Sequence, residues 1–218
     1  MSPKELIQNL INLQNGYANV PRAIITSERL KYAHAMMAKK IDVEDTMLRE
    51  PLLEHVGHLP IIASFLHPHI EHTKEVDLGR VLIMLSIHDI GETVLGDVIS
   101  YSKNADQTEE ENQIVQKLLP KQLLSYFEEF EERKSFDAKY AKSVDSMAPF
   151  LHEIEKPKLT LQRFAFWNLD SKKIETKKRE LFEWDSVLKQ MFEVYLDAFH
   201  AIERGEPTGF TSSSFDLA

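Results

Sequence analysis

The segment DLGRVLIMLSIHD, residues 77–89, decides the fold class of this chain. Asp77 is suited to the N-cap of a helix, because its carboxylate can accept hydrogen bonds from the unpaired N–H groups of the first turn. The residues that follow are mostly apolar, which favours a helix packed in the protein core. Because no part of the sequence alternates apolar and polar residues over the length of a strand, we predict an all-α fold.

Helical periodicity continues on both sides of this segment, and it predicts a bundle in one domain. The domain spans residues 1–204, with its core at 49–156 and its C-terminal helices at 171–203. Residues 205–218 are rich in Gly, Pro and Ser, which predicts a flexible tail. A loop is expected at 96–106 and a connector at 167–170. The remaining predicted helices cover residues 6–15, 27–40, 51–66 (interrupted or kinked at Pro60), 107–119, 121–134, 135–155, 171–183 and 185–203.

The composition excludes several classes of protein. The 218 residues include no cysteine, which rules out disulfides, thiolate metal sites and cysteine nucleophiles. A formal net charge of −9 argues against a general nucleic-acid binder, which needs a basic face. The longest apolar run, residues 81–87, is far too short to span a membrane, and the N-terminus does not resemble a signal peptide. We therefore expect a cytoplasmic protein without a nucleic-acid or membrane partner.

The end of the helix predicted over 77–89 carries the residues most able to perform chemistry. His88 and Asp89 are adjacent, and an imidazole beside a carboxylate provides half of a site for a divalent transition-metal ion. Glu92 lies four residues after His88, so it falls on the same side if the helix or a turn continues. Asp97 follows a glycine and is free to point back across the site.

Two other predicted helices supply further candidates. The helix over 51–66 contains His55, and the helix over 135–155 contains Asp145, a lone acid in an otherwise amphipathic segment. Its apolar neighbours indicate that Asp145 faces inward. Buried carboxylates are rare unless they are paired or bind a metal, so Asp145 is a candidate ligand.

Each of these features also has an ordinary structural interpretation. A single His-Asp pair at a helix end is most often a cap or an ion pair, and a lone aspartate is more often a half-exposed polar residue. His67, His69 and His72 are close together in the sequence, but they flank a proline in an expected surface turn, which favours a turn over a metal cluster. It is the combination of separate His and Asp positions that favours a functional site.

This combination resembles the HD-domain metal-dependent phosphohydrolases, in which a histidine, a later His-Asp doublet and a distant aspartate come from separate helices. Within that superfamily the chain looks most like the 5′-deoxynucleotidase branch. The resemblance covers residues 49–156 and implies an HD-domain-like helical bundle. The motifs that carry it are Glu54-His55, His88-Asp89 with Glu92 and Asp97, and VDSMAPFLHEIE at 144–155.

The resemblance also implies a site and a reaction. One divalent metal ion (Mn, Co, Mg, Fe, Ni or Zn) would be bound by His55, His88, Asp89 and Asp145. The acids that handle protons in catalysis would be Glu92 and Asp97. The reaction implied is hydrolysis of a nucleoside or deoxynucleoside 5′-monophosphate to nucleoside and phosphate, and the assembly implied is a homodimer.

A small anionic, nucleotide-like substrate needs cations besides the metal on a protein of net charge −9. The candidates are Arg22, Arg49 and Lys103, of which the arginines could bind a phosphate in a bidentate manner. Arg22 ends a Val-Pro-Arg segment that resembles the substrate-binding arginine of the branch.

Three other functions stay open at this point. The chain could be a metal- or nucleotide-binding sensor without catalysis, an HD hydrolase of another nucleotide class, or a purely structural bundle. The apolar positions of the last helix could form a dimer interface or close the core of the monomer; they are Leu188, Phe192, Tyr195, Leu196 and Phe199.

Overall fold

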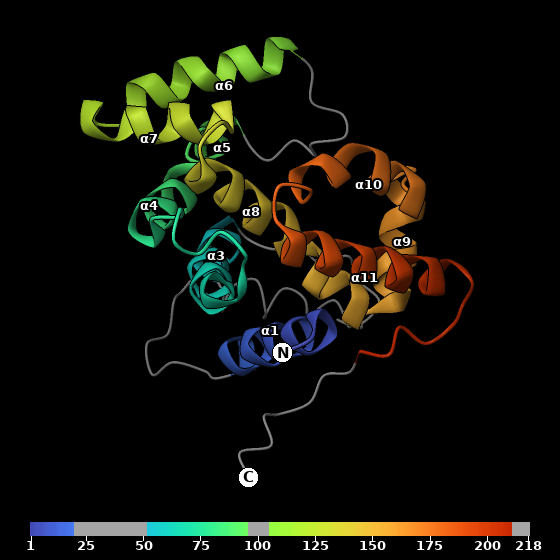
Figure 1. Cartoon of the computed structure of the whole chain (residues 1–218). Coiled ribbons are helices and arrows are strands. Elements are labelled where there is room, and N and C mark those ends of the chain that lie inside the picture. Colours follow the sequence, from blue (N-terminus) through green and yellow to red (C-terminus); the bar gives the residue numbers. More distant parts are fainter. Residues whose placement is uncertain (20–51, 96–104, 211–218) are drawn as a thin grey trace.

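Every regular element in the described part of the chain is a helix, which confirms the all-α prediction (Figure 1). The computed structural model describes residues 1–19, 52–95 and 105–210, so the helix predicted at 27–40 lies outside the described residues. The elements are α1 (Pro3–Asn19), α3 (Leu52–Leu66), η1 (His67–His69), α4 (Leu78–Ile87), α5 (Glu92–Leu95), α6 (Ala105–Leu118), α7 (Lys121–Glu132), α8 (Phe136–Glu155), α9 (Pro157–Trp167), α10 (Ser171–Lys178), η2 (Arg179–Leu181) and α11 (Ser186–Glu203).

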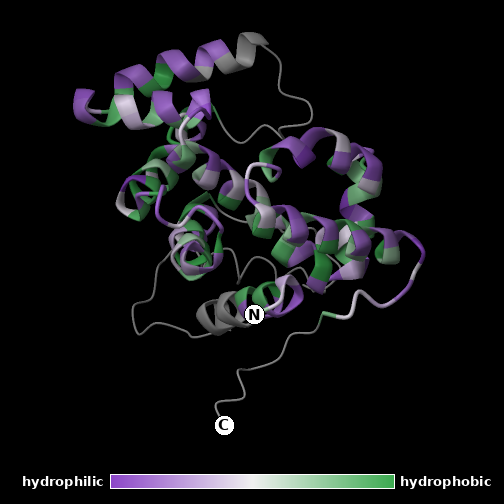
Figure 2. Cartoon of the chain, in the orientation of Figure 1, coloured by the Kyte–Doolittle hydropathy of each residue, from purple (hydrophilic) through white to green (hydrophobic). Residues whose placement is uncertain are grey.

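Helix α8 lies at the centre of the bundle and contacts most of the other helices. The helices α3, α4 and α7 pack on one part of its surface, and α1, α9, η2 and α11 pack on others. Most of its residues are buried, including several polar ones, because other helices pack around it on several sides. Figure 2 shows hydrophobic residues concentrated in α3, α8 and α11, whereas α6 and α10 are largely hydrophilic.

The apolar residues of α11 close the core of the monomer. All five that the sequence left open between a core and a dimer interface are buried within the chain, and Phe192 stacks on Phe182 with ring centroids 4.7 Å apart. Burial of such side chains is the main favourable contribution to folding, at about 1.5–3 kcal/mol each. The expected homodimer therefore cannot use these side chains and stays a prediction.

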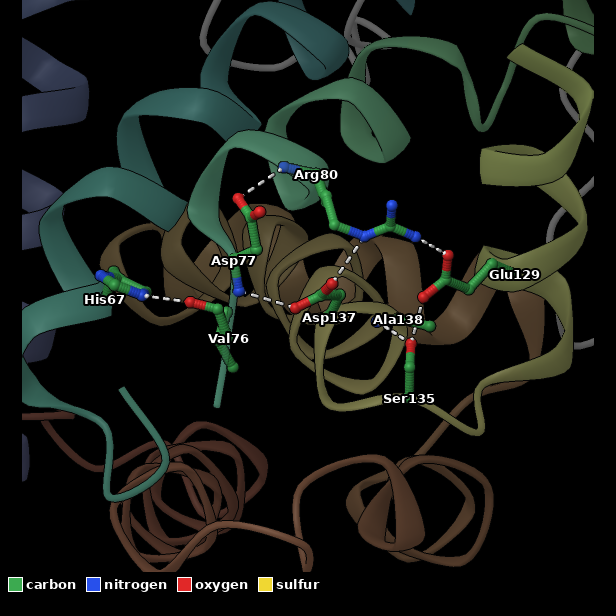
Figure 3. A network of polar contacts seen from close by, with 8 residues as sticks. All are labelled: His67, Val76, Asp77, Arg80, Glu129, Ser135, Asp137 and Ala138. Atoms are coloured by element: carbon green, nitrogen blue, oxygen red, sulfur yellow. Dashed lines mark hydrogen bonds and ion pairs between the residues drawn. The ribbon is translucent and has the colours of Figure 1, made fainter. Parts of the chain in front are cut away.

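A set of polar contacts, here called the α4–α8 clamp, joins the start of α4 to the start of α8 and to the end of α7 (Figure 3). The backbone N–H of Asp77 donates to Oδ1 of Asp137 at 2.7 Å, and Nε of Arg80 donates to Oδ2 of the same carboxylate at 2.9 Å. The guanidinium of Arg80 also pairs with Glu129, whose other oxygen accepts from Ser135 at 2.6 Å. Charged pairs of this kind fix geometry as well as adding stability.

The clamp determines where two candidate residues meet. At about 1.5 Å per residue, His88 lies about 16 Å along α4 from Asp77, and Asp145 lies about 12 Å along α8 from Asp137. The two helices start together and run in the same direction. His88 and Asp145 therefore lie at similar distances from that common start and come close to each other.

Several predicted boundaries differ from the structure. Helix α1 continues through Gly16 to Asn19 instead of ending at residue 15, because glycine weakens a helix without forbidding it. Helices α3 and α8 continue past Pro60 and Pro149. The segment predicted as one helix at 171–183 is α10 followed by the short 3₁₀ turn η2.

Helix α9 was not predicted from the sequence. Helix α8 ends at Glu155 as predicted, and Pro157 is the first residue of a new helix. Proline favours this position because the N–H group it lacks would have no partner in the first turn.

The segment predicted as a tail packs on the bundle over residues 205–210. Phe210 is buried in the core, and Oγ1 of Thr208 donates to the carbonyl of Ile154 at 2.9 Å. Residues 211–218 lie outside the described residues. In the part of the chain that the structure describes, no helix combines the length and the apolar character needed to cross a bilayer.

Candidate metal centre

Four residues from three helical segments come together in the middle of the bundle. His55 comes from the first turn of α3, and Asp145 from the middle of α8. Helix α4 ends at Ile87, earlier than predicted, so His88 is its C-cap residue and Asp89 lies in the following turn. The Nε2 atom of His55 is 3.5 Å from Oδ2 of Asp89 and 3.3 Å from Oδ1 of Asp145. The Nε2 atom of His88 is 3.0 Å and 3.4 Å from the same two oxygens.

The environment of His88 fixes which ring nitrogen faces this centre. Its Nδ1 atom is 3.0 Å from the carbonyl oxygen of Leu85, which can only accept a hydrogen bond, so Nδ1 carries the proton. When the ring is neutral, as in a metal complex, the Nε2 atom keeps a lone pair directed at the two carboxylates. This atom is buried and makes no hydrogen bond, although two oxygens lie within 3.4 Å of it. The two facing oxygens are satisfied either by a proton on Nε2 or by a metal ion bound between the nitrogen and the carboxylates.

The pKa values of His88 and Asp145 show that the centre favours a positive charge between the carboxylates. Burial lowers the pKa of His88, but the charges of Asp145 and Asp89 raise it by more, to about 9. Burial raises the pKa of Asp145, whereas the charges of Lys142 and His88 and hydrogen bonds from the histidines hold it well below its usual range. The two carboxylates thus create a negative potential that a proton on His88 satisfies when no metal ion is bound.

The nitrogen–oxygen distances of the centre fit a transition-metal ion, and the ligand atoms of His55, His88 and Asp145 all lie within 4.8 Å of one another. Two ligand atoms at about 2.1 Å from one ion lie about 3.0 Å apart at octahedral angles and about 3.4 Å apart at tetrahedral angles. The nitrogen–oxygen distances of 3.0–3.5 Å cover this range. Two imidazoles and two carboxylates form a donor set that suits Mn, Fe, Co, Ni and Zn ions. His55, Asp89 and Asp145 keep side-chain exposures of 16–18%, so the centre is accessible from solvent.

Lys142, which the sequence analysis did not single out, contacts this centre. It precedes Asp145 by three residues on α8, and its Nζ atom donates to Oδ2 of Asp145 at 2.9 Å. This bond leaves Oδ1 of Asp145 to face the two histidines. Nζ of Lys142 also lies 4.6 Å from the centroid of the Phe130 ring, which stabilises a cation. The i, i+3 spacing from a predicted inward-facing acid was the available signal.

Lys178 is a second cation close to the centre. It is the last residue of α10 and is half-buried. Burial and the nearby charge of Lys142 lower the pKa of Lys178 to about 8, while the charge of Asp145 acts in the opposite direction.

The structure describes only one of the remaining predicted site residues. Glu92 begins α5, and its backbone N–H donates to the carbonyl of Asp89 at 3.0 Å, which holds it one turn beyond the metal doublet. The other predicted catalytic acid, Asp97, and the three predicted substrate-binding cations, Arg22, Arg49 and Lys103, lie outside the described residues.

The histidines near Pro68 do not gather into one cluster. His67 contacts the carbonyl of Val76 at 3.1 Å through Nε2, and His69 lies against Phe65. His72 instead lies beside Glu71 and Asp185, and potential ligand atoms of these three residues are within 4.8 Å of one another. Both carboxylates accept hydrogen bonds from the backbone at the start of α11.

Comparisons with known proteins agree with this fold. A family model described as the HD domain matches residues 38–183. Among solved structures, the chain is similar to the crystal structure of a predicted metal-dependent phosphohydrolase from Magnetospirillum magnetotacticum MS-1. The identity is 24% and the TM-score 0.61, over 85% of this chain and 99% of that one, which shows a shared fold. A search of curated proteins found no significant match.

Proposed function

The chain belongs to the HD domain family, and on this premise we propose that it is a metal-dependent phosphomonoesterase. The substrate we propose is a nucleoside or deoxynucleoside 5′-monophosphate, which would be hydrolysed to nucleoside and phosphate. The finer assignment rests on the 5′-deoxynucleotidase motifs around His55, His88-Asp89 and Asp145. The observation that carries the proposal is the convergence of Nε2 of His55 and Nε2 of His88 on the same two carboxylate oxygens, at 3.0–3.5 Å.

The solved structure with the same fold supports the reaction class. The Magnetospirillum protein is described as a predicted metal-dependent phosphohydrolase, and nearly its whole length aligns with this chain. A catalytic rather than a structural role for the centre also agrees with its partial exposure, since structural metal sites are usually closed by four protein ligands and have no room for substrate.

In this proposal, the four clustered side chains hold the metal. Leu85 orients the imidazole of His88 through Nδ1, and Lys142 orients the carboxylate of Asp145 through Oδ2. Such supporting hydrogen bonds fix the direction of the ligand atoms. When bound, a divalent ion supplies a water of lowered pKa and positive charge beside the phosphoryl oxygens.

The remaining chemistry is proton transfer, which we assign to carboxylates beyond the ligands. Glu92 comes one turn after Asp89 and is half-buried, which supports its carboxylate as the base that takes a proton from the attacking water. Asp97 would give a proton to the departing 5′ oxygen of the nucleoside. A positioned acid or base of this kind typically contributes on the order of 10²–10⁴ in rate.

The proposal is tested by metal analysis and by phosphate release. Protein purified without chelator should contain about one divalent ion per chain, as a single four-ligand site requires. A panel of nucleoside 5′-monophosphates, with Mn²⁺, Co²⁺ or Mg²⁺ added, should release phosphate. A protein that binds the metal and a nucleotide but releases no phosphate would instead be a sensor, and a protein that binds no metal would be a structural bundle.

A further inference from the structure

The two oxygens of the Asp145 carboxylate have different partners. Oδ1 lies 3.3 Å from Nε2 of His55 and 3.4 Å from Nε2 of His88, so it faces the point where the ligand atoms converge. Oδ2 instead accepts a hydrogen bond from Nζ of Lys142 at 2.9 Å. One oxygen of Asp145 is therefore available to a metal ion, and the other is occupied by an ammonium group.

A buried aromatic ring helps to hold Lys142 in this place. The centroid of the Phe130 ring is 4.6 Å from Nζ of Lys142 and 5.1 Å from the centroid of the His88 ring. The face of an aromatic ring attracts a cation, which favours the ammonium group at this position. Phe130 thus contacts both the ammonium group and a metal ligand, and so fixes Lys142 relative to the centre.

The oxygen that Lys142 occupies is the one that could join two metal ions. A carboxylate joins two ions when each of its oxygens binds one of them, and the ions of two-metal catalytic sites lie about 3.5–4 Å apart. Among the described residues, Asp145 belongs to a single group of three or more potential ligands, with His55 and His88. A second ion on this side of the centre would therefore have to share the carboxylate of Asp145 through Oδ2.

An ammonium group and a metal ion cannot share Oδ2. The two positive charges would lie within a few ångströms of each other in a partly buried site, where their repulsion is only weakly screened. The side chain of Lys142 is 25% exposed and that of Asp145 is 17% exposed, so solvent cannot easily separate the pair. The hydrogen bond from Lys142 thus closes Oδ2 to a second ion.

We propose that Lys142 is a positioning residue that restricts Asp145 to one ligand oxygen, Oδ1, and so limits the centre to a single metal ion. The ammonium group takes the place that a second ion would have in a two-metal site. This inference rests on the proposed function, in which Glu92 and Asp97 transfer protons and are not ligands of a further ion.

The test counts Mn²⁺ ions per chain by titration and uses electron paramagnetic resonance to detect magnetically coupled pairs of ions. The wild type should saturate at about one ion per chain and show only isolated Mn²⁺. Lys142→Met should bind a second ion and show coupled pairs, because methionine leaves Oδ2 of Asp145 free and removes the repelling charge. Lys142→Arg keeps a charged donor and should bind one ion.

The matched control is Lys139→Met. Lys139 lies one turn earlier on α8, and its Nζ atom lies 5.5 Å from the centroid of the Phe136 ring. This variant removes the same charge from the same helix and leaves the hydrogen bond between Lys142 and Asp145 in place. It should bind one ion per chain, like the wild type.

A wild type that binds two ions would overturn the proposal. So would a Lys142→Met protein that saturates at one ion or loses the metal, since Lys142 would then only stabilise Asp145. A crystal structure of the Mn²⁺-loaded wild type gives a measurement that needs no variant: Asp145 should bind through Oδ1 alone, with Lys142 still on Oδ2, and binding through both oxygens would contradict the proposal. Because the ions are counted without substrate, these results are separate from a failure of the wild type to release phosphate.

Discussion

Two clusters of histidine and acidic side chains in this molecule have similar residue types, but one is suited to bind a metal ion and the other caps a helix. The metal centre combines His55, His88 and Asp145, with Asp89 within 3.5 Å of both histidines. The second cluster, here called the α11 cap, combines Glu71, His72 and Asp185. Each places potential ligand atoms within 4.8 Å of one another.

The difference lies in where the lone pairs of the acids are directed. In the α11 cap, Asp185 accepts hydrogen bonds from the backbone N–H groups of Val187, Leu188 and His72, and Glu71 accepts from Ser186. The ring of His72 stacks on Phe136 with centroids 4.7 Å apart and lies 5.7 Å from Trp184. These contacts give every member an ordinary structural task.

In the metal centre, by contrast, the Nε2 atoms of His55 and His88 converge on the same two carboxylate oxygens at 3.0–3.5 Å. Residue types and proximity are therefore not enough to indicate a metal site. The decisive feature is a set of nitrogen and oxygen ligand atoms that converge on one point instead of accepting hydrogen bonds from a helix start.

The largest expected effect comes from removing a ligand of the metal centre. Asp89→Ala should lower the metal content from about one ion per chain to a small fraction of that and abolish turnover, because a four-ligand site loses both a donor and a negative charge. Elemental analysis and phosphate release measure the two effects. Full metal content in this variant would remove the distinction between the two clusters.

A change beside the centre should separate catalysis from metal binding. Glu92→Gln should retain the metal and lose activity by about 10²-fold or more, because the amide cannot accept the proton that the carboxylate takes. The measurement is kcat at saturating substrate together with metal content. An active Glu92→Gln protein would leave the centre without its assigned base.

Metal binding at the centre should depend on pH. The pKa of His88 is raised to about 9 in the metal-free centre, so below pH 9 the metal must displace a proton. Affinity for Mn²⁺ should therefore rise about tenfold per pH unit between pH 6 and pH 9 and then level off. Calorimetry in two buffers of different ionisation enthalpy should detect the released proton, and an affinity independent of pH would contradict this account.

The smallest effect is expected from the α11 cap. Asp185→Ala should reduce the free energy of unfolding by about 1–2 kcal/mol, because the start of α11 loses its N-cap. Urea denaturation of the metal-loaded protein measures this loss. Metal content should stay at the wild-type level; a loss of metal without a loss of stability would show that the α11 cap, and not the centre, binds the ion.

The sequence predicted the fold class and the metal centre for different reasons. The fold class follows from local patterns: the cap at Asp77, the apolar run after it, and the helical period elsewhere. His88 and Asp89 were visible because they are adjacent, and Asp145 because an acid on an apolar face is rare. The clamp that brings them to the same height depends on Asp137 and Glu129, which look like ordinary surface acids in the sequence.

The lysines of the centre were missed for a similar reason. Lys178 belongs to the run Lys177-Lys178-Arg179, which is typical of a solvated helix face, yet it is half-buried in the structure. Lys142 differs from other lysines only in its distance to Asp145. The α11 cap could not be distinguished from a metal cluster before the backbone donors at Val187 and Leu188 were known.

The central claim is tested most directly by anomalous diffraction from crystals of the wild-type protein grown with Mn²⁺. The account predicts one strong anomalous peak per chain within coordination distance of Nε2 of His55, Nε2 of His88, Asp89 and Asp145. A peak between Glu71, His72 and Asp185, or the absence of any peak among the four residues of the centre, would contradict it.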